Sequence, residues 1–158
     1  MANSSPGTRI RTLWGRLKPL PLGTWLFSRM VGLMVPYTGT IGAHVRELEP
    51  GRSRVTLRDR RRVRNHLDCV HAVALVNLGE VTSGLAMMTA LPPGVRGIVT
   101  GLSIEYLKKA RGTITGRSAP TIPTVSSTID TIVTADMTDS SGDVVARTHV
   151  TWRLSPPA

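Results

Sequence analysis

The sequence predicts an α+β fold in which a single curved antiparallel sheet wraps one long buried helix. Residues 68–91 form a run that is apolar nearly all round, as in a helix that is buried on most sides. Segments before and after this run alternate apolar and polar residues with the period of half-buried strands. The order is therefore a hairpin, one helix and three or four further strands, which is typical of an antiparallel sheet packed on a helix.

The chain is long enough for one domain with a core of its own. It has 158 residues, and aromatic side chains make up only 4% of them, so the core should be mostly aliphatic. The single cysteine, Cys69, excludes an intrachain disulfide and a cysteine-based zinc site, and the four histidines show no metal-ligand spacing. No metal or cofactor is expected. The polar start of the chain lacks the features of a signal peptide, so a cytoplasmic location is expected.

Residues 1–36 are predicted to form a helical extension outside a core domain that spans residues 37–158. Thr8 can cap a first helix, which two prolines end. Thr24 can cap a second helix that runs to about Val35, before a further proline. The apolar residues that recur at helical spacing in the first helix are Ile10, Leu13, Trp14 and Leu17.

The predicted sheet is read from alternating segments. Residues 41–46 and 54–58 flank a turn at 49–52 and predict a hairpin. Asp68 can cap the central helix, and the Pro-Pro-Gly sequence at 92–94 ends it. In the first strand after the helix, a shared face is expected for the even-numbered residues from Ile98 to Tyr106. The predicted strands after the helix are 98–106, 113–119, 129–137 and 144–154.

Glu80 is the most unusual residue of the central helix. It is the only formally charged residue between Asp68 and Arg96, and its neighbours are otherwise small or apolar. A carboxylate at such a place loses much of its hydration, which is unfavourable unless a partner or a function compensates. Glu80 is therefore either a functional carboxylate or a structural one that bonds a backbone amide or an arginine across a dimer.

The start of the same helix offers a second feature that could take part in catalysis. Backbone amides near His71, Ala72 and Val73 lack intrahelical partners and could stabilise an oxyanion, while Glu80 could attack a thioester or activate a water. The nine-residue spacing places Glu80 about half a turn from His71 and roughly 13 Å further along the helix. The two groups could meet around one small substrate only across two chains, so the pattern implies a two-fold dimer with composite sites.

The segment 64–80 resembles the signature of hotdog-fold thioesterases. Asn65, His71 and Glu80 stand where the phenylacetyl-CoA thioesterase-like branch and its uncharacterised bacterial relatives have an Asn, a His-Gly-Gly and an acidic residue nine positions after the His. Residues 104–112 resemble the strand that follows the helix in such proteins.

The resemblance covers about residues 37–154 and implies a hotdog fold and an acyl-CoA thioesterase that acts as a homodimer or a tetramer. The amides of Ala72 and Val73 are the implied oxyanion site. One departure concerns these positions, because the usual two glycines are replaced: Ala72 adds a methyl group and Val73 adds bulk near the sulfur. The alternative reading is therefore a hotdog protein that binds an acyl-CoA or an acyl carrier without turning it over.

The other implied roles concern four side chains. Glu80 is the nucleophile or the general base. Asn65 orients the thioester or the attacking water, and its alternative role is that of a turn residue. His71 shapes the site, and its alternative is a helix-start histidine that bonds a nearby carbonyl. Ser83, about one turn beyond Glu80, could position a water.

The net charge is +10, and arginine dominates it. Residues 58–64 hold five arginines, and residues 106–111 hold three more positive charges. In the thioesterase reading these clusters meet the phosphates of coenzyme A, and the alternative is a solvated basic surface. The candidate residues for coenzyme A are Arg62, Arg64, Tyr106, Lys108, Lys109 and Arg111.

A basic charge could also favour nucleic acid or a membrane, but neither partner is expected. Nucleic acid binding has phosphate contacts in its favour, but no recognised motif is present and stacking aromatics are scarce. A membrane span is not expected because residues 20–35, although fairly apolar, are interrupted by proline, glycine and arginine. A helix that lies on an anionic bilayer surface stays open as an alternative.

Overall fold

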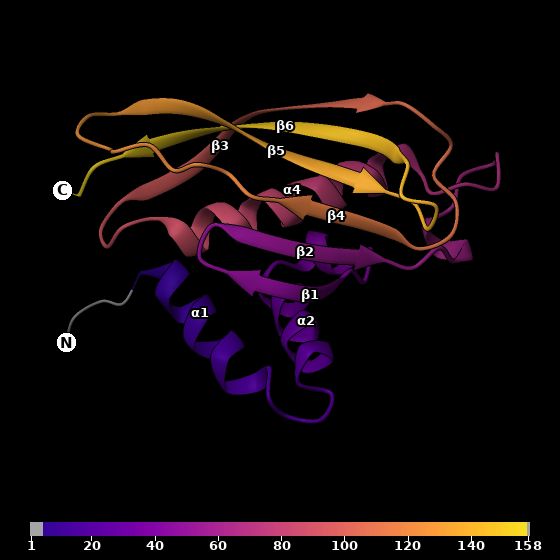
Figure 1. Ribbon diagram of the computed structural model, residues 1–158, viewed down its shortest axis with the longest axis horizontal. Coiled ribbons are helices and arrows are strands. Elements are labelled where there is room, and N and C mark those ends of the chain that lie inside the picture. The colour runs from indigo at the N-terminus through magenta and orange to yellow at the C-terminus, as the bar shows by residue number, and fades with distance from the viewer. Residues whose placement is uncertain (1–4, 158) are drawn as a thin grey trace.

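Figure 1 shows the computed structural model, which describes residues 5–157. One six-stranded antiparallel sheet, in the order β1-β2-β4-β5-β6-β3, curves over the long helix α4 (Ala72–Ala90) and confirms the predicted α+β arrangement. The strands are β1 (His44–Glu49), β2 (Arg52–Leu57), β3 (Arg96–Tyr106), β4 (Ile114–Ser118), β5 (Ile129–Thr138) and β6 (Val144–Ser155).

Alternation in the sequence identified the inner face of most strands. In β6 every second residue is buried against α4, as predicted, because successive side chains of a strand point to opposite faces. The same holds in β5 and β2. The buried inward residues of these strands include Val55, Leu57, Val133, Ala135, Met137, Thr148, Val150, Trp152 and Leu154.

Strand β3 corrects one prediction. Its register with β6 shifts between Val99 and Gly101, which marks a β-bulge. Ile98 lies opposite Arg153, whereas Leu102 lies opposite Val150, so the bulge puts Ile98 and Leu102 on different faces of the sheet. The predicted shared face of the even-numbered residues from Ile98 to Tyr106 is therefore wrong at its first residue. A one-residue shift exchanges the two faces of a strand, and alternation alone does not reveal where it occurs.

Helix α4 begins later than predicted. Asp68 has φ of +51° and belongs to a turn, so it is not the helix cap. His71 is the residue at the cap position, and its Nδ1 accepts a hydrogen bond of 3.1 Å from the backbone N–H of Val73. Histidine is an uncommon cap, and the usual preference for Asp, Ser, Thr and Asn explains why the sequence pointed to Asp68.

The N-terminal helices are α1 (Pro6–Leu17) and α2 (Gly23–Met34), followed by the short helix α3 (Pro36–Gly39). Their predicted caps are wrong. The Oγ of Ser5, and not Thr8, caps α1 by accepting from the Thr8 amide. Leu22, in the left-handed region, precedes α2, and Thr24 instead lies inside α2 with its hydroxyl 3.1 Å from His44 Nε2.

Helices α1 and α2 lie on the side of α4 that the sheet leaves open, below α4 in Figure 1. The Trp14 and Phe27 rings meet edge to face, with centroids 4.9 Å apart, and join α1 to α2. Helix α1 approaches α4 closely at Gly7, where a Cβ would stand 1.9 Å from the carbonyl oxygen of Met88. Helix α1 therefore packs against the central helix along its otherwise uncovered side, while α2 packs against α1 and β1.

Helix α4 is long and apolar enough to cross a membrane by length and composition, with a mean hydropathy of 1.3. About 67% of this stretch is buried inside the domain, as expected of the core helix around which a sheet folds.

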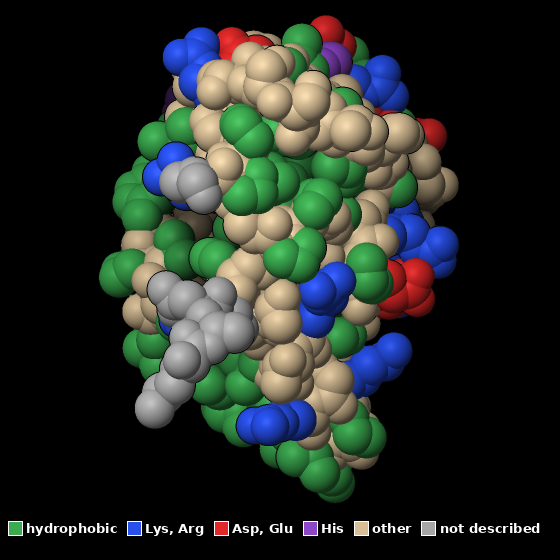
Figure 2. Space-filling view, turned by 90° about the vertical axis from the view of Figure 1, so that its left-hand side faces the viewer, with side chains coloured by type: hydrophobic (Ala, Val, Ile, Leu, Met, Phe, Trp, Pro, Cys, Tyr) green, Lys and Arg blue, Asp and Glu red, His purple; other side chains and the backbone are tan. Residues whose placement is uncertain are grey.

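Apolar side chains also reach the surface. Figure 2 shows them exposed, with lysine and arginine side chains between them, at the end of the molecule where both termini lie. Patches of this kind are typical of protein–protein interfaces. The predicted homodimer stays a prediction, with α2 and β3 as candidate contact elements. Their large exposed apolar residues include Trp25, Leu26, Leu33, Met34, Ile98 and Leu102.

Candidate functional site

A cavity lies between the N-terminal helices and the central helix. This apolar cavity has a volume of about 550 Å³ and is lined by residues of α1, α2, α3, α4 and β6. Glu80 is the one acidic residue among those that line it. Most of the others are apolar and include Ile10, Leu13, Phe27, Met34, Leu85 and Met88.

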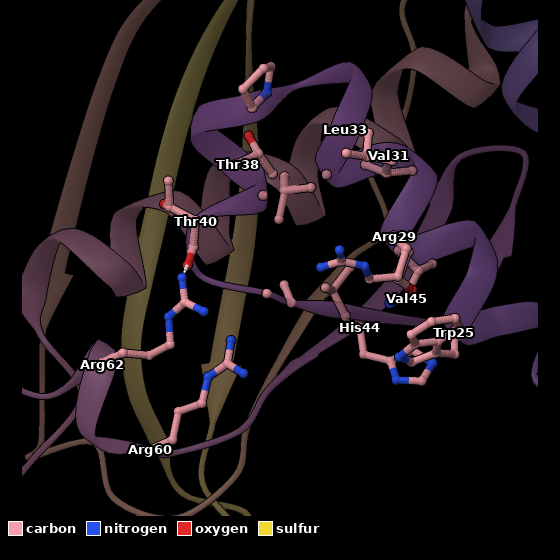
Figure 3. A pocket seen from close by; sticks show the side chains of 18 residues that line it. Trp25, Arg29, Val31, Leu33, Thr38, Thr40, His44, Val45, Arg60 and Arg62 are labelled. Atoms are coloured by element: carbon pink, nitrogen blue, oxygen red, sulfur yellow. Dashed lines mark hydrogen bonds between the residues drawn. The ribbon is translucent and has the colours of Figure 1, made fainter.

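A second hollow adjoins the first. This basic pocket, of about 670 Å³, lies between α2, α3, β1 and the segment that precedes α4. Figure 3 shows Arg60 and Arg62 rising side by side from that segment, with Arg29 reaching in from α2. Val31 and Val81 line both hollows, so the two spaces are neighbours.

The Glu80 carboxylate faces the apolar cavity without a protein partner. It makes no hydrogen bond and no ion pair with any residue of the described chain from 5 to 157. Burial among apolar groups raises the pKa of Glu80 above the usual carboxyl value of 4.5, and no neighbouring charge offsets this. The structural alternative, a carboxylate held by a backbone amide or an arginine, is therefore not what one chain shows.

Trp152 lines the same cavity from β6. Its Nε1–H is fully buried and has no hydrogen-bond partner among residues 5–157. A Cβ at Gly84 would stand 3.7 Å from Trp152 Cζ2 and 3.9 Å from Glu80 Oε1, so the six-membered ring of the indole and the carboxylate flank the same glycine. An aromatic ring and a carboxylate thus line one apolar space, which suits an apolar ligand with a polar group near Glu80.

The sequence assigned Trp152 only to the inner face of a strand. The alternation of β6 showed that this side chain points inward, but the orientation of an indole ring about its own bonds depends on its neighbours in three dimensions. Gly84 could have been a signal, because a glycine one helical turn from Glu80 leaves room beside the carboxylate.

The start of α4 does not reach the cavity. None of the residues from His71 to Val73 lines it, in keeping with the distance along the helix that the sequence implied. The Val73 amide donates to His71 Nδ1, whereas the Ala72 amide has no acceptor among residues 5–157. The Ala72 carbonyl accepts from the Tyr106 hydroxyl at 3.2 Å. In one chain, the two halves of the implied site are therefore separate.

Asn65 and Ser83 have local roles in one chain. The Asn65 Oδ1 accepts from the backbone N–H groups of Leu67, at 2.9 Å, and Cys69, at 3.4 Å, and so organises the turn before α4. The Ser83 hydroxyl is fully buried and donates to the Glu80 carbonyl at 3.1 Å. Neither residue lines the apolar cavity.

Of the residues that the sequence suggested for coenzyme A, most lie outside the basic pocket and one lines it. Arg64 pairs with Asp59 at 2.6 Å, and Lys108 lies between the carboxylates of Asp139 and Asp143, so their charges are already largely neutralised. Arg111 donates to the Asp68 carbonyl at 3.4 Å, and Lys109 is exposed. Arg62 is the predicted residue that lines the basic pocket.

Sequence reasoning missed two arginines of that pocket. Arg29 lies on α2, in the segment treated as an extension, and Arg60 was one of several indistinguishable arginines in residues 58–64. Among residues 5–157, no group of three or more His, Cys, Asp or Glu side chains could hold a metal ion.

Three solved structures resemble the domain over most of its length. The first is a structural-genomics target protein, at 29% identity and a TM-score of 0.79, which covers 92% of this chain and 97% of that chain. A Pseudomonas aeruginosa protein of unknown function whose name includes "Probable Thioesterase" is 22% identical, at a TM-score of 0.75, over 86% of this chain and 96% of that chain. A Haemophilus influenzae thioesterase is 16% identical, at a TM-score of 0.66, over 76% of this chain and 82% of that chain.

These comparisons establish the fold and the family. No curated protein matches the chain. The two structures below 25% identity support the fold alone. That fold is the hotdog fold of thioesterases. A family model described as "Domain of unknown function (DUF4442)" matches residues 23–154, which is most of the sequence. The chain therefore belongs to the DUF4442 family and has the hotdog fold.

Proposed function

We propose that this protein hydrolyses the thioester of an acyl-CoA, with Glu80 as the reacting carboxylate. The observation that carries the proposal is a carboxylate, without a partner among residues 5–157, on the wall of an apolar cavity. At about 550 Å³ the cavity is in the size range of small-molecule sites, and its lining suits an acyl chain. A poorly solvated carboxylate is also a stronger base than one in water.

Two chemical routes fit this geometry. In one, Glu80 takes a proton from a water while the water oxygen bonds to the thioester carbon; the C–S bond then breaks, and the thiolate leaves and is protonated. In the other, a Glu80 oxygen bonds to that carbon and the C–S bond breaks, so that the thiolate leaves and is protonated; water then cleaves the resulting anhydride, which releases the acyl group as a carboxylic acid and restores Glu80. Both need donors for the oxyanion, a role that backbone amides at a helix start can fill. The chemistry uses side chains of the protein and no cofactor.

We further propose that a homodimer completes the site. The first turn of α4 is remote from Glu80 within one chain, so its Ala72 amide would have to come from a second copy. Pairing of dimers into tetramers and a cytoplasmic location stay predictions of the sequence.

A second candidate function is binding without turnover. The Val73 amide, one of the two implied oxyanion donors, is held by the His71 ring, which leaves the Ala72 amide as the donor at that helix start. A site with one donor fewer stabilises a tetrahedral intermediate less well. In this case the protein would hold an acyl-CoA or an acyl carrier and leave the thioester intact.

The two candidates separate in one assay. Purified protein is incubated with acyl-CoAs of short, medium, long and aromatic acyl groups, and the free thiol that appears is measured, with binding followed in parallel. Turnover of at least one acyl group is the expected result. Measurable binding of acyl-CoAs without release of thiol from any of them would contradict hydrolysis and favour the second function.

The pH dependence of hydrolysis should report the burial of Glu80. As a base or nucleophile Glu80 must be deprotonated, and burial raises its pKa above 4.5. We therefore expect kcat/KM to be constant at neutral pH and to fall tenfold per pH unit on the acid side of a midpoint above that of a free glutamate. Initial rates between about pH 4 and 9 would show the midpoint. An acid midpoint at or below 4.5 would contradict the assignment.

A further inference from the structure

We infer that the basic pocket binds a phosphate group of the thioester carrier, so that one chain holds an anionic head in the basic pocket and the acyl tail in the apolar cavity. The identity of the ligand rests on the proposed function, whereas the phosphate site rests on the pocket itself. Neither Arg29 nor Arg60 was among the residues that the sequence suggested for coenzyme A. The phosphate site thus keeps the predicted Arg62 and adds Arg29 and Arg60, at the junction of α2, α3 and β1.

The charges in this pocket have one sign. Arg29, Arg60 and Arg62 line it, and no Asp or Glu is among its lining residues. None of these arginines forms an ion pair with any residue of the described part of the chain. Burial and the nearby Arg46 lower the pKa of His44, the fourth basic residue, so it is neutral at pH 7 and can act as a donor or acceptor. Three uncompensated guanidinium groups around one hollow favour an anion such as phosphate.

Two of the arginines are held in place. Arg60 Nη2 donates to the Ile41 carbonyl at 2.9 Å, and Arg62 Nη2 donates to the Thr40 carbonyl at 3.2 Å. Each guanidinium keeps further N–H groups for a ligand. Gly42 makes this arrangement possible, because a Cβ there would stand 2.2 Å from Arg60 Nη2. Fixed donors bind an anion with less loss of side-chain entropy than mobile ones.

The surroundings of the pocket suit the nucleotide base and the acyl tail of such a ligand. Trp25, which is 52% exposed, lies beside His44 at the mouth and presents a flat ring on which a base could stack (Figure 3). On the inner side the lining residues Val31, Thr38 and Val81 are shared with the apolar cavity, where Glu80 lies. A basic hollow and an apolar one thus share a wall, with the carboxylate on the apolar side.

The test measures binding without catalysis. Coenzyme A, adenosine 3′,5′-bisphosphate and 4′-phosphopantetheine are each titrated into wild type, Arg29→Gln and Arg62→Gln by calorimetry. Arg29 has no hydrogen bond or ion pair with another described residue, so its replacement should leave the fold intact. Arg16→Gln, at an exposed position of α1 outside both hollows, is the matched control. We expect a Kd for coenzyme A about tenfold weaker in each pocket variant and unchanged in the control.

The outcomes separate the inference from the proposed function. If both pocket variants bind coenzyme A within about twofold of wild type, or if wild type binds none of the three probes, the phosphate site is wrong even where thioesters are hydrolysed. If binding weakens as expected but no thioester is hydrolysed, the site stands and the enzyme proposal fails. Weaker binding of the bisphosphate in the pocket variants would place the nucleotide of coenzyme A here. An effect on phosphopantetheine alone would instead indicate the prosthetic group of a carrier protein.

Discussion

Replacing Glu80 with glutamine is expected to lower kcat for thioester hydrolysis by about 10³-fold, because the amide keeps the shape of the side chain but neither accepts a proton nor forms a reactive acyl intermediate. Binding of acyl-CoA should persist, since the carboxylate contacts the reacting centre and not the phosphates. Thiol release and equilibrium binding, measured on the same preparation, check the two halves of this expectation.

The same substitution should stabilise the folded protein at neutral pH. Since burial raises the pKa of Glu80, the folded state disfavours the ionised carboxylate, and this cost is present above the folded pKa and disappears as the pH falls below the unfolded one. Glutamine removes it, so thermal unfolding at pH 7 should shift upward by about 2–4 °C, the shift that ~1 kcal/mol produces in a domain of this size. The difference from wild type should shrink as the pH is lowered.

Glu49→Gln is the control for both effects. Its side chain is 59% exposed and pairs only loosely with Arg52, at 3.7 Å, so activity and melting temperature should stay close to those of wild type. If Glu80→Gln keeps more than about a tenth of the wild-type kcat, the carboxylate is not the reacting group.

Replacing Gly79 with alanine is expected to destabilise the domain by about 2 kcal/mol. A Cβ at this position of α4 would stand 2.3 Å from Cγ2 and 2.4 Å from Oγ1 of Thr148 in β6. Thr148 is fully buried and β-branched, so it has little freedom to turn away. The helix preference of alanine, about 1 kcal/mol, is too small to offset this clash. Chemical or thermal unfolding would show the loss as a melting temperature lower by roughly 4–8 °C.

Gly15→Ala is the matched control, because it makes the same chemical change in a helix where nothing lies within 4 Å of the added methyl group. This variant should gain about 0.5–1 kcal/mol. In the double variant Gly79→Ala, Thr148→Ala, the two closest atoms are removed and part of the stability should return. A Gly79→Ala protein as stable as wild type would mean that α4 and β6 are less tightly packed than described.

The elements of the fold were largely predictable, because each depends on a pattern that the sequence carries locally. Alternation placed Val133, Val150 and Leu154 on the inner face, and continuous apolarity identified α4. Helix starts were less predictable. Several residues near each start can act as caps. Asp68 is not the cap because it belongs to a turn that the Asn65 side chain organises by hydrogen bonds, and His71 caps the helix instead.

The candidate site was predictable only in part. Glu80 stood out because a lone charge in an apolar helix is unfavourable wherever the helix packs. Trp152, Arg29 and Arg60 did not stand out, because each matters only through neighbours from other elements. The indole ring lies beside Gly84, and the guanidinium groups meet between α2 and the segment before α4. Such meetings depend on the packing of the N-terminal helices, which no local pattern specifies.

The position of α1 has a consequence for how relatives could diverge. The family match begins at residue 23, yet Pro6, Ile10 and Leu13 of the preceding helix form one wall of the apolar cavity. In the proposed thioesterase, this helix would therefore contribute to selectivity for the length and shape of the acyl group. Exchange of this helix between two such thioesterases would then transfer acyl preference from one to the other.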